Sequence, residues 1–524
     1  MTVKMEIFDF AGTGNIKEVI LGEKDITLSE FVAVARYDAK VILSGSYCDR
    51  TEKSRELLIR IIKDGRSLYG VNTGFGYNCD KPINSEDAAR LQRNILLSHA
   101  CSVGEPLDRE AVRGIMLMML LNLGQGYSGV RPDTLSFVAG LLNGDVTPFV
   151  PSHGSVGYLS VEAHIALLTA GEGKAFYKNR LLQASEALRE AAIIPPGLEH
   201  KEGLALISGT TSVTALAALS LYDALKTAMT LDIAGAMSLE ALKGTIRAFD
   251  PRLQEVRRHE EQRATAANLR NILGDSEIAQ KYINCRLQDA LSLRCIPQLH
   301  GAVKKTLKDA YETIIREMNS CCDNPVLYPL GQEDGEALAG CNADGAYVGI
   351  AADTISIAAV NLAKMSERRI AKILNREESG LPAFLVENPG LNSGYMISQY
   401  SAAGILGEMR ILAHPSTIDN VPTCANQEDY VSMGYNASRK AFQVSGLLEA
   451  IAAIELMTAA QGLEFLHPLK SSMAIAEVRR TMRTVVPKLS EDMLLYPYIE
   501  AVKALVHEGS IIRCVENITG ALEM

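Results

Sequence analysis

Residues 208–243 read SGTTSVTALAALSLYDALKTAMTLDIAGAMSLEALK, and this stretch decides the fold class. Alanine, leucine, methionine and threonine dominate it, and it contains no proline. A helix that is apolar on every side lies inside a large bundle, because a surface helix keeps one polar face. Residues 346–363 and 441–460 have the same character. The sequence therefore predicts a mainly α-helical protein built on a long central helix bundle.

The N-terminal region differs, because it carries most of the glycine and turn signals. Helices are still expected there. Thr27 and Glu30 form a capping box before an apolar run, and Ala88, Leu91 and Ile95 follow a helical period. We expect residues 1–200 to form a smaller, loop-rich part and residues 201–524 to form the bundle. No linker separates the two, so one continuous fold with an approximate boundary is predicted.

Composition excludes several classes of protein. The 524 residues include 52 Lys and Arg against 62 Asp and Glu, a net charge of −10 without a dense basic run, which does not favour nucleic-acid binding. The longest unbroken apolar run, residues 115–121, is far shorter than the ~20 residues of a membrane span, and residues 1–6 lack a signal-peptide pattern. Ten Cys without a CxxC pair and nine His without an HExxH motif predict a reduced, cytoplasmic protein without a metal site.

Four short polar stretches interrupt the apolar pattern. Residues 69–76, YGVNTGFG, form a glycine-punctuated loop that bears one tyrosine. Arg294 lies in an otherwise apolar stretch, and a buried arginine needs an anion, either a structural carboxylate or the carboxylate of a substrate. Residues 319–325 are typical of a turn, and residues 426–429 are typical of a helix cap. Taken singly, each stretch is weak evidence of function.

Together these stretches resemble histidine ammonia-lyase and the wider aromatic amino acid lyase and aminomutase family. The resemblance implies a mainly helical fold and a homotetramer whose active sites draw residues from three subunits. Ser98-His99 and Gln427-Glu428 resemble the histidine-specific branch, in which the matching residues face an imidazole ring. The matching segments are 69–76, 91–94, 98–99, 154–157, 163–167, 202–206, 292–295, 323–325, 366–369 and 426–429.

The departures from the family pattern are as informative as the matches. Family members carry Ala-Ser-Gly directly after the GSVG element, and this triplet cyclises into an electrophilic methylidene-imidazolone that captures the amine of the substrate. Here Gly157 is followed at once by Tyr158, which stands where the family has Asp. Further departures are Ser208 for an Asn that supports the electrophile, Leu291 for a Tyr, and Ala343-Asp344 within the family's NFHG element.

A quaternary nitrogen would make the electrophile unnecessary, because it has no N–H to lose and no lone pair to add to the ring. A site for such a betaine needs extra volume, an anion and aromatic faces. The missing triplet and Ala343 remove bulk, Asp344 supplies a candidate charge, and Tyr158 and Tyr395 are candidate aromatic faces. Within the family, the chain is then similar to ergothionases. The expected substrate is an imidazole betaine, ergothioneine or hercynine, and ergothioneine would give trimethylamine and thiourocanate without a cofactor.

The resemblance also implies roles for the matched residues. Tyr69 would remove the Cβ proton, which requires a lowered pKa. Arg294 would clamp the carboxylate, and Glu428 and His99 would hold the imidazole. Two amides would complete the carboxylate or base network, namely Asn324 and Gln288.

Two other functions remain open at this point. One is a histidine or aromatic amino acid ammonia-lyase, or a 2,3-aminomutase, whose methylidene-imidazolone is missing from the printed sequence. The other is a family member that lost its prosthetic group and persists in a structural or binding role. The intact Tyr69, Arg294 and Glu428 favour an enzyme.

Overall fold

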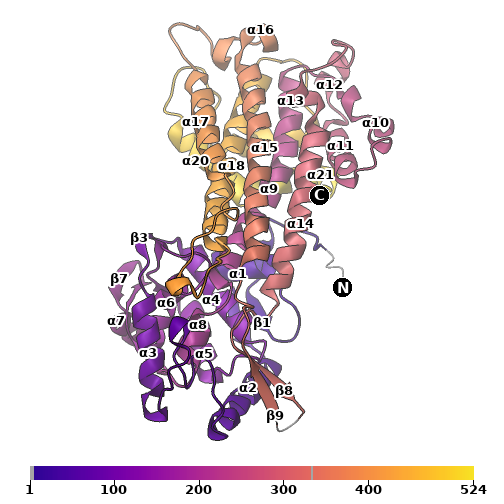
Figure 1. Ribbon diagram of the computed structural model, residues 1–524. Coiled ribbons are helices and arrows are strands. Elements are labelled where there is room, and N and C mark those ends of the chain that lie inside the picture. Colours follow the sequence, from indigo (N-terminus) through magenta and orange to yellow (C-terminus); the bar gives the residue numbers. More distant parts are fainter. Residues whose placement is uncertain (1–4, 332–333) are drawn as a thin grey trace.

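The computed structural model describes residues 5–331 and 334–524, and most of them are helical (Figure 1). The helices of the N-terminal part are α1 Leu28–Tyr37, α2 Gly45–Lys63, α3 Ala88–His99, α4 Arg109–Leu123, α5 Pro132–Asn143, α6 Ser160–Ala166, α7 Ala184–Glu190 and α8 Glu202–Ile207. Those that follow are α9 Thr211–Ala241, α10 Pro251–Glu255, α11 Glu260–Leu273, α12 Glu277–Tyr282, α13 Leu291–Arg294, α14 Ile296–Met318, α15 Ala346–Leu374, α16 Arg376–Ser379, α17 Met396–Leu412, α18 Gly434–Glu464, α19 Met473–Met482, α20 Tyr496–His507 and α21 Ser510–Thr519.

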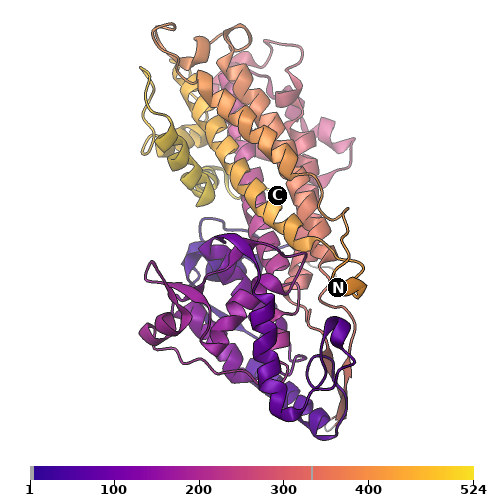
Figure 2. The ribbon, with the colours of Figure 1, turned by 60° about the vertical axis from the view of Figure 1, so that its left-hand side comes forward.

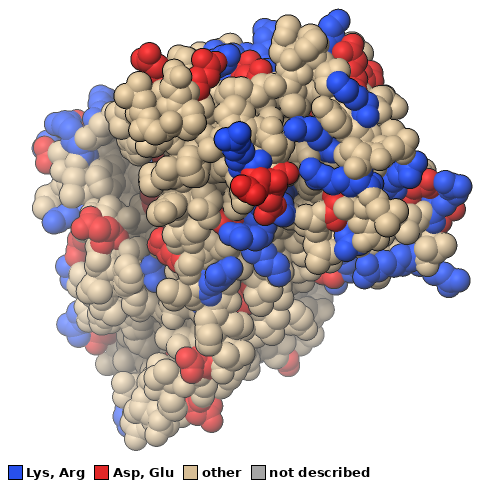
Figure 3. Space-filling model, turned by 90° about the horizontal axis from the view of Figure 1, so that it is seen from above, with Lys and Arg blue, Asp and Glu red and all other residues tan. Residues whose placement is uncertain are grey.

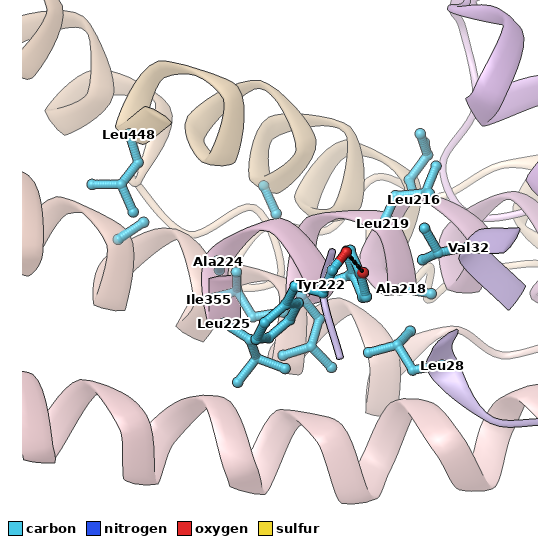
Figure 4. Close-up of a cluster of buried hydrophobic side chains, with 14 of the residues drawn as sticks. Leu28, Val32, Leu216, Ala218, Leu219, Tyr222, Ala224, Leu225, Ile355 and Leu448 are labelled. Carbon is cyan, nitrogen blue, oxygen red and sulfur yellow. Dashed lines mark hydrogen bonds between the residues drawn. The ribbon is translucent and has the colours of Figure 1, made fainter. Parts of the chain in front are cut away.

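The central bundle is built on α9, α15 and α18, which pack along one another as the three apolar stretches predict. All residues of α9 are buried. Figure 4 shows Leu216, Leu219 and Tyr222 of α9 among side chains from α1, α15 and α18. The mainly helical fold class is therefore confirmed.

Helix α15 extends well beyond the apolar stretch 346–363 that predicted it, and Arg369 in this extension is buried in an ion pair with α18. Arg369 donates to both carboxylate oxygens of Glu455, at 2.5 and 2.9 Å, and neither side chain is exposed. The hydroxyls of Ser238 and Ser366 also donate to Glu455, at 2.7 and 2.5 Å. A fully satisfied polar cluster thus ties α9, α15 and α18 together at a position that hydropathy alone would place outside a core.

We expect Arg369→Ala to lower the free energy of unfolding by about 3–5 kcal/mol, because it leaves the Glu455 charge buried without its partner. Denaturant unfolding at fixed protein concentration measures the change. Arg252→Ala is the matched control, since it removes an ion pair with Asp250 that lies in solvent. Equal stability of the two variants would show that the buried pair contributes no more than an exposed one.

Short sheets shape the N-terminal part of the molecule. Strand β1 (Glu18–Leu21) pairs in parallel with β2 (Lys40–Leu43), in the register Glu18↔Lys40. The antiparallel pairs are β3 (Val103–Pro106) with β5 (Pro151–His153), and β6 (Lys174–Tyr177) with both β4 (Thr147–Pro148) and β7 (Arg180–Gln183).

One hairpin from the second half of the chain returns to this part. Strands β8 (Val326–Leu330) and β9 (Asp334–Leu338) lie beside α2 at the end of the molecule remote from α16 (Figure 1). The backbone N–H of Leu327 donates to the carbonyl of Tyr127 at 2.8 Å. The loop-rich part is therefore not formed by residues 1–200 alone. Figure 2 shows it beneath the bundle, from which α9, α15 and α18 descend toward it.

Three segments are long and apolar enough to cross a membrane by length and composition, although the sequence has no long unbroken apolar run. The first segment contains α8 and α9, the second is α15 and the third is α18. In this fold 100%, 61% and 78% of their respective most apolar windows are buried within the protein.

Candidate active site

A cavity of about 570 Å³ lies where the loop-rich part meets the starts of the long helices. It brings together six of the predicted site residues, which come from six different segments of the chain. They are Tyr69 from the loop before α3, His99 at the end of α3, Tyr158 before α6, Ser208 after α8, Asn324 before β8 and Glu428 before α18.

Tyr69 is held by its own loop. Its phenol oxygen accepts a hydrogen bond from the backbone N–H of Gly76, at 2.8 Å. Burial raises the pKa of Tyr69, the Gly76 donor opposes this rise, and the nearby Glu428 adds to it. The described residues that line the cavity include no Lys or Arg. A single chain therefore offers Tyr69 one donor but no cation, and the lowered pKa that a base requires must come from another source.

His99 and Glu428 form the polar wall that faces Tyr69. The ring of His99 is fixed by a 2.9 Å hydrogen bond between its Nδ1 and the Ser98 hydroxyl, and by edge contact with Phe75 at 5.7 Å between ring centroids. Burial lowers the pKa of His99, which favours the neutral ring. Glu428 accepts a hydrogen bond from the Thr423 hydroxyl at 2.9 Å and forms no ion pair with any described residue. One neutral imidazole and one uncompensated carboxylate are thus available to a ligand.

The cavity floor is formed by a tight turn. The N–H of Ser160 donates to the carbonyl of Tyr158 at 3.2 Å, and Leu159 between them has φ 78° and ψ −64°, the strained geometry of a γ-turn. Leu159 also donates its N–H to the carbonyl of Ile207 at 3.2 Å. Burial raises the pKa of Tyr158, and the charge of Glu428 raises it further. Tyr158 therefore presents a neutral phenol to the cavity.

This floor does not fit a methylidene-imidazolone. The ring is made from consecutive Ala, Ser and Gly, and no Ala-Ser-Gly triplet occurs anywhere in the sequence. Gly157 leads straight into the γ-turn, and an ideal Cβ on Gly157 would already lie 3.0 Å from the Ser432 hydroxyl.

Asn324 lines the cavity, Asp344 directly follows the lining residue Ala343, and both have local structural partners. The N–H of Asn324 donates to the Ser208 hydroxyl at 3.2 Å, and its side-chain oxygen accepts from the N–H of Gly340 at 2.9 Å. One oxygen of Asp344 accepts from the N–H of Ala346 at 2.9 Å, which caps the start of α15. Asp344 is not among the lining residues, but its charge raises the pKa of Tyr158 after burial and Glu428. It is therefore a helix cap that lies close enough to act on the cavity electrostatically.

Three predicted site residues lie elsewhere in this chain. Gln288 precedes α13 and Arg294 is the last residue of that helix, which Figure 1 shows at the opposite end of the molecule from α3, α6 and α8. Arg294 forms no ion pair with any described residue, and its buried Nε has no hydrogen-bond partner. Tyr395 precedes α17, is 1% exposed, and has a pKa raised to about 12 by burial. Within one chain, Tyr395 is not an aromatic face of the cavity.

The end of the bundle that carries α13 is seen from above in Figure 3. Basic and acidic side chains are interspersed over this face, so it shows no continuous basic field of the kind that nucleic-acid binding requires.

Comparison with known proteins identifies the family to which this fold belongs. A family model described as aromatic amino acid lyase matches residues 26–484. The chain belongs to the aromatic amino acid lyase family. This lyase is 43% identical to a histidine ammonia-lyase of Symbiobacterium thermophilum, over 95% of this chain and 98% of that protein.

Solved structures agree with this assignment. Histidine ammonia-lyase from Trypanosoma cruzi superposes with a TM-score of 0.88 at 35% identity, over 96% of this chain and 95% of that one. An ergothioneine-degrading ergothionase from Treponema denticola superposes with a TM-score of 0.86 at 25% identity, over 94% of this chain and 99% of that one. The specific similarity to ergothionases expected from the sequence is thus a distant one, and the sequence lies nearer to the histidine ammonia-lyases named here.

The cavity of this lyase also contains residues that sequence reasoning missed. Phe75 stands inside the motif at residues 69–76 and Tyr77 directly follows it, so motif position could have identified them. Cys341 and Cys424 line the cavity as well, and nothing in their local sequence indicated it.

A second cavity of about 600 Å³ is lined in part by Asp223, Glu449 and His507, and these three residues offer no uncompensated charge to a ligand as Glu428 does in the first cavity. The oxygens and nitrogen of this trio lie close enough to hold a metal. However, Lys226 contacts both carboxylates, at 2.8 and 3.4 Å, and Arg36 also pairs with Asp223. The charges are therefore already compensated within the protein.

Proposed function

We propose that this protein is a carbon–nitrogen lyase of the histidine ammonia-lyase type, which removes nitrogen from the α-carbon of an imidazole-bearing substrate. The observation that carries the proposal is the placement of Tyr69 in one cavity with His99 and Glu428. His99 and Glu428 would hold the imidazole ring through its two nitrogens. Tyr69 would then take the proton from Cβ, as the electrons of that C–H bond form the double bond and the nitrogen leaves from Cα.

The substrate's carboxylate requires a cation that the described cavity lining lacks. Arg294 is the candidate, because its guanidinium has no acidic partner within the described chain. Since Arg294 lies at the far end of the same molecule, we propose that a second copy supplies it, in a homotetramer with shared active sites. Gln288, which lies beside α13, would enter the site with it.

Histidine, with ammonia as the leaving group, is the first candidate substrate. It is supported by similarity to histidine ammonia-lyases over nearly the whole chain. The chemical difficulty is that a base removes an ammonium N–H more readily than a Cβ–H, and the residues that would form the activating electrophile are not in the sequence.

An imidazole betaine such as hercynine or ergothioneine, with trimethylamine as the leaving group, is the second candidate. It is supported by the missing triplet and by the cavity lining, in which aromatic rings and Glu428 occur without any Lys or Arg among the described residues. The fixed positive charge of such a substrate would also lower the pKa of the buried Tyr69. The aromatic residues of the lining are Tyr69, Phe75, Tyr77, His99 and Tyr158.

Incubation with histidine, hercynine and ergothioneine in parallel, with ammonia and trimethylamine quantified, decides between these candidates. Ammonia from histidine, together with an intact mass that differs from the printed sequence, would establish the first. Trimethylamine from a betaine, with an intact mass equal to that of the printed sequence, would establish the second. The absence of turnover with all three would favour an inactive family member.

We expect Asp344→Asn to weaken binding of a betaine more than binding of an uncharged imidazole analogue. Asparagine keeps a side-chain oxygen for the N–H of Ala346, so the helix cap is retained while the charge is lost. Competitive inhibition constants for the two ligands measure the difference. Equal losses would assign Asp344 to the helix cap alone.

The pH dependence should follow the titration of Tyr69. Its phenolate is the active form, and its pKa lies above the ordinary value, so kcat/KM should rise with pH between about pH 7 and pH 10. The kcat profile reports the enzyme–substrate complex. It should level off at a lower pH than the kcat/KM profile if a cationic substrate depresses the pKa of Tyr69. A flat kcat/KM over the same range would remove Tyr69 as the titrating base.

A further inference from the structure

Two loops meet at the mouth of the cavity. One carries Tyr69 and contains the short helix η2 (Gly76–Asn78), and the other precedes Glu428 and contains η7 (Cys424–Asn426). They touch where the Cys424 sulfur packs on Gly76, so closely that an ideal Cβ on Gly76 would lie 2.6 Å from it. Gly76 has φ +56° and is also the residue that donates to the Tyr69 oxygen. The sulfur of one loop therefore rests on the residue that positions the proposed base on the other.

A second thiol lies one short turn further along the Tyr69 loop. Cys79 ends η2, and its N–H donates to the carbonyl of Gly76 at 3.2 Å. Cys79 and Cys424 are both free and exposed, and both lie close enough to Tyr69 to add to the rise of its pKa, after burial and Glu428. Two accessible thiols thus flank the same contact from opposite loops.

The η7 turn is held in a strained conformation. Cys424, Ala425 and Asn426 have φ values of 52°, 54° and 66°, a left-handed conformation that costs energy for Cys and Ala and that Asn adopts more readily. Movement of this turn would therefore relieve strain at Cys424 itself.

We propose that Cys79 and Cys424 form a redox modification site, in which a disulfide oxidant joins them and fixes the two loops together. A thiolate attacks the oxidant and releases one thiol, and the second cysteine then attacks the mixed disulfide and releases the other. The protein loses two protons and two electrons, and the oxidant is reduced to two thiols. The new bond clamps the mouth between Tyr69 and Glu428, which blocks entry of the substrate. The loss of activity rests on the proposed function, whereas formation of the bond does not.

The test uses the full-length protein incubated with oxidised glutathione, followed by peptide mass mapping without reduction and by an activity assay. The expected result is a Cys79–Cys424 peptide, a loss of activity of at least about tenfold, and recovery on addition of dithiothreitol. Cys79→Ser should keep the basal activity and resist inactivation. The matched control is Cys101→Ser, which removes another exposed thiol and should remain sensitive.

Peptide mapping separates failure of this inference from failure of the proposed function. A Cys79–Cys424 bond in a protein without any lyase activity would keep the modification site and overturn the proposed function. Absence of the bond, a bond to a different cysteine, or equal inactivation of Cys79→Ser would overturn the inference.

Discussion

Tyr69→Phe should lower kcat by about 10²- to 10⁴-fold while the binding of substrate analogues changes little. The substitution removes one oxygen, which accepts a single hydrogen bond from the Gly76 N–H. The ring stays in place, and the contacts proposed for His99 and Glu428 with the substrate do not depend on the Tyr69 hydroxyl. Steady-state kinetics and inhibitor binding measured on the same preparation separate the chemical step from recognition.

Tyr77→Phe provides the matched control for this variant. Tyr77 lines the same cavity, is 68% exposed, and has no hydrogen-bond partner for its hydroxyl among the described residues. It should therefore retain most of the activity. If Tyr69→Phe is as active as Tyr77→Phe, then Tyr69 is not the base.

Arg294→Ala should be nearly inactive, and mixing it with the equally inactive Tyr69→Phe should restore activity. Arg294 and Tyr69 lie at opposite ends of one chain, so the shared site proposed above would take one of them from each of two copies. In randomly mixed assemblies with equal amounts of both chains, about a quarter of the sites receive the native residue at both positions. Co-expression of the two variants with different tags, followed by tandem purification and assay, measures the recovery.

This recovery has a built-in control, because the double variant Tyr69→Phe/Arg294→Ala cannot be rescued by mixing with itself. If the mixed assemblies stay as inactive as the separate variants, Arg294 does not complete a site in another copy, and its unpaired guanidinium needs a different explanation. The oligomeric state of each preparation should be measured by light scattering alongside the assay.

The helical bundle could be predicted from sequence because α9, α15 and α18 contain apolar stretches that are too long to be strands. Their ends could not be predicted in the same way. Arg369 lies beyond the apolar stretch 346–363 and looks like a surface residue in sequence, and its pairing with Glu455 lets α15 continue through the core. The return of β8 and β9 to the N-terminal part was also unpredictable, because it depends on contacts distant in sequence.

The candidate site was predicted in part. Tyr69, His99 and Glu428 stand in motifs that resemble those of the family, and the fold places all three around one cavity. Asp344 carried no such signal, and its helix cap is the turn or capping role that its position before Gly345 favours. The position of Tyr395 could not be derived, because burial depends on packing that local sequence does not record.

The γ-turn at Leu159 has a consequence for engineering this protein. Glu162, three residues further on, accepts hydrogen bonds from the hydroxyl of Thr211 and the N–H of Ser212, both at 3.1 Å, and so anchors α6 to the first turn of α9. Leu159 is tied to Ile207 on the same side, and Gly157 packs on Ser432 on the other. We expect three extra residues grafted between positions 157 and 158 to disturb these anchors. Installing the Ala-Ser-Gly triplet here therefore calls for several coordinated substitutions rather than one insertion.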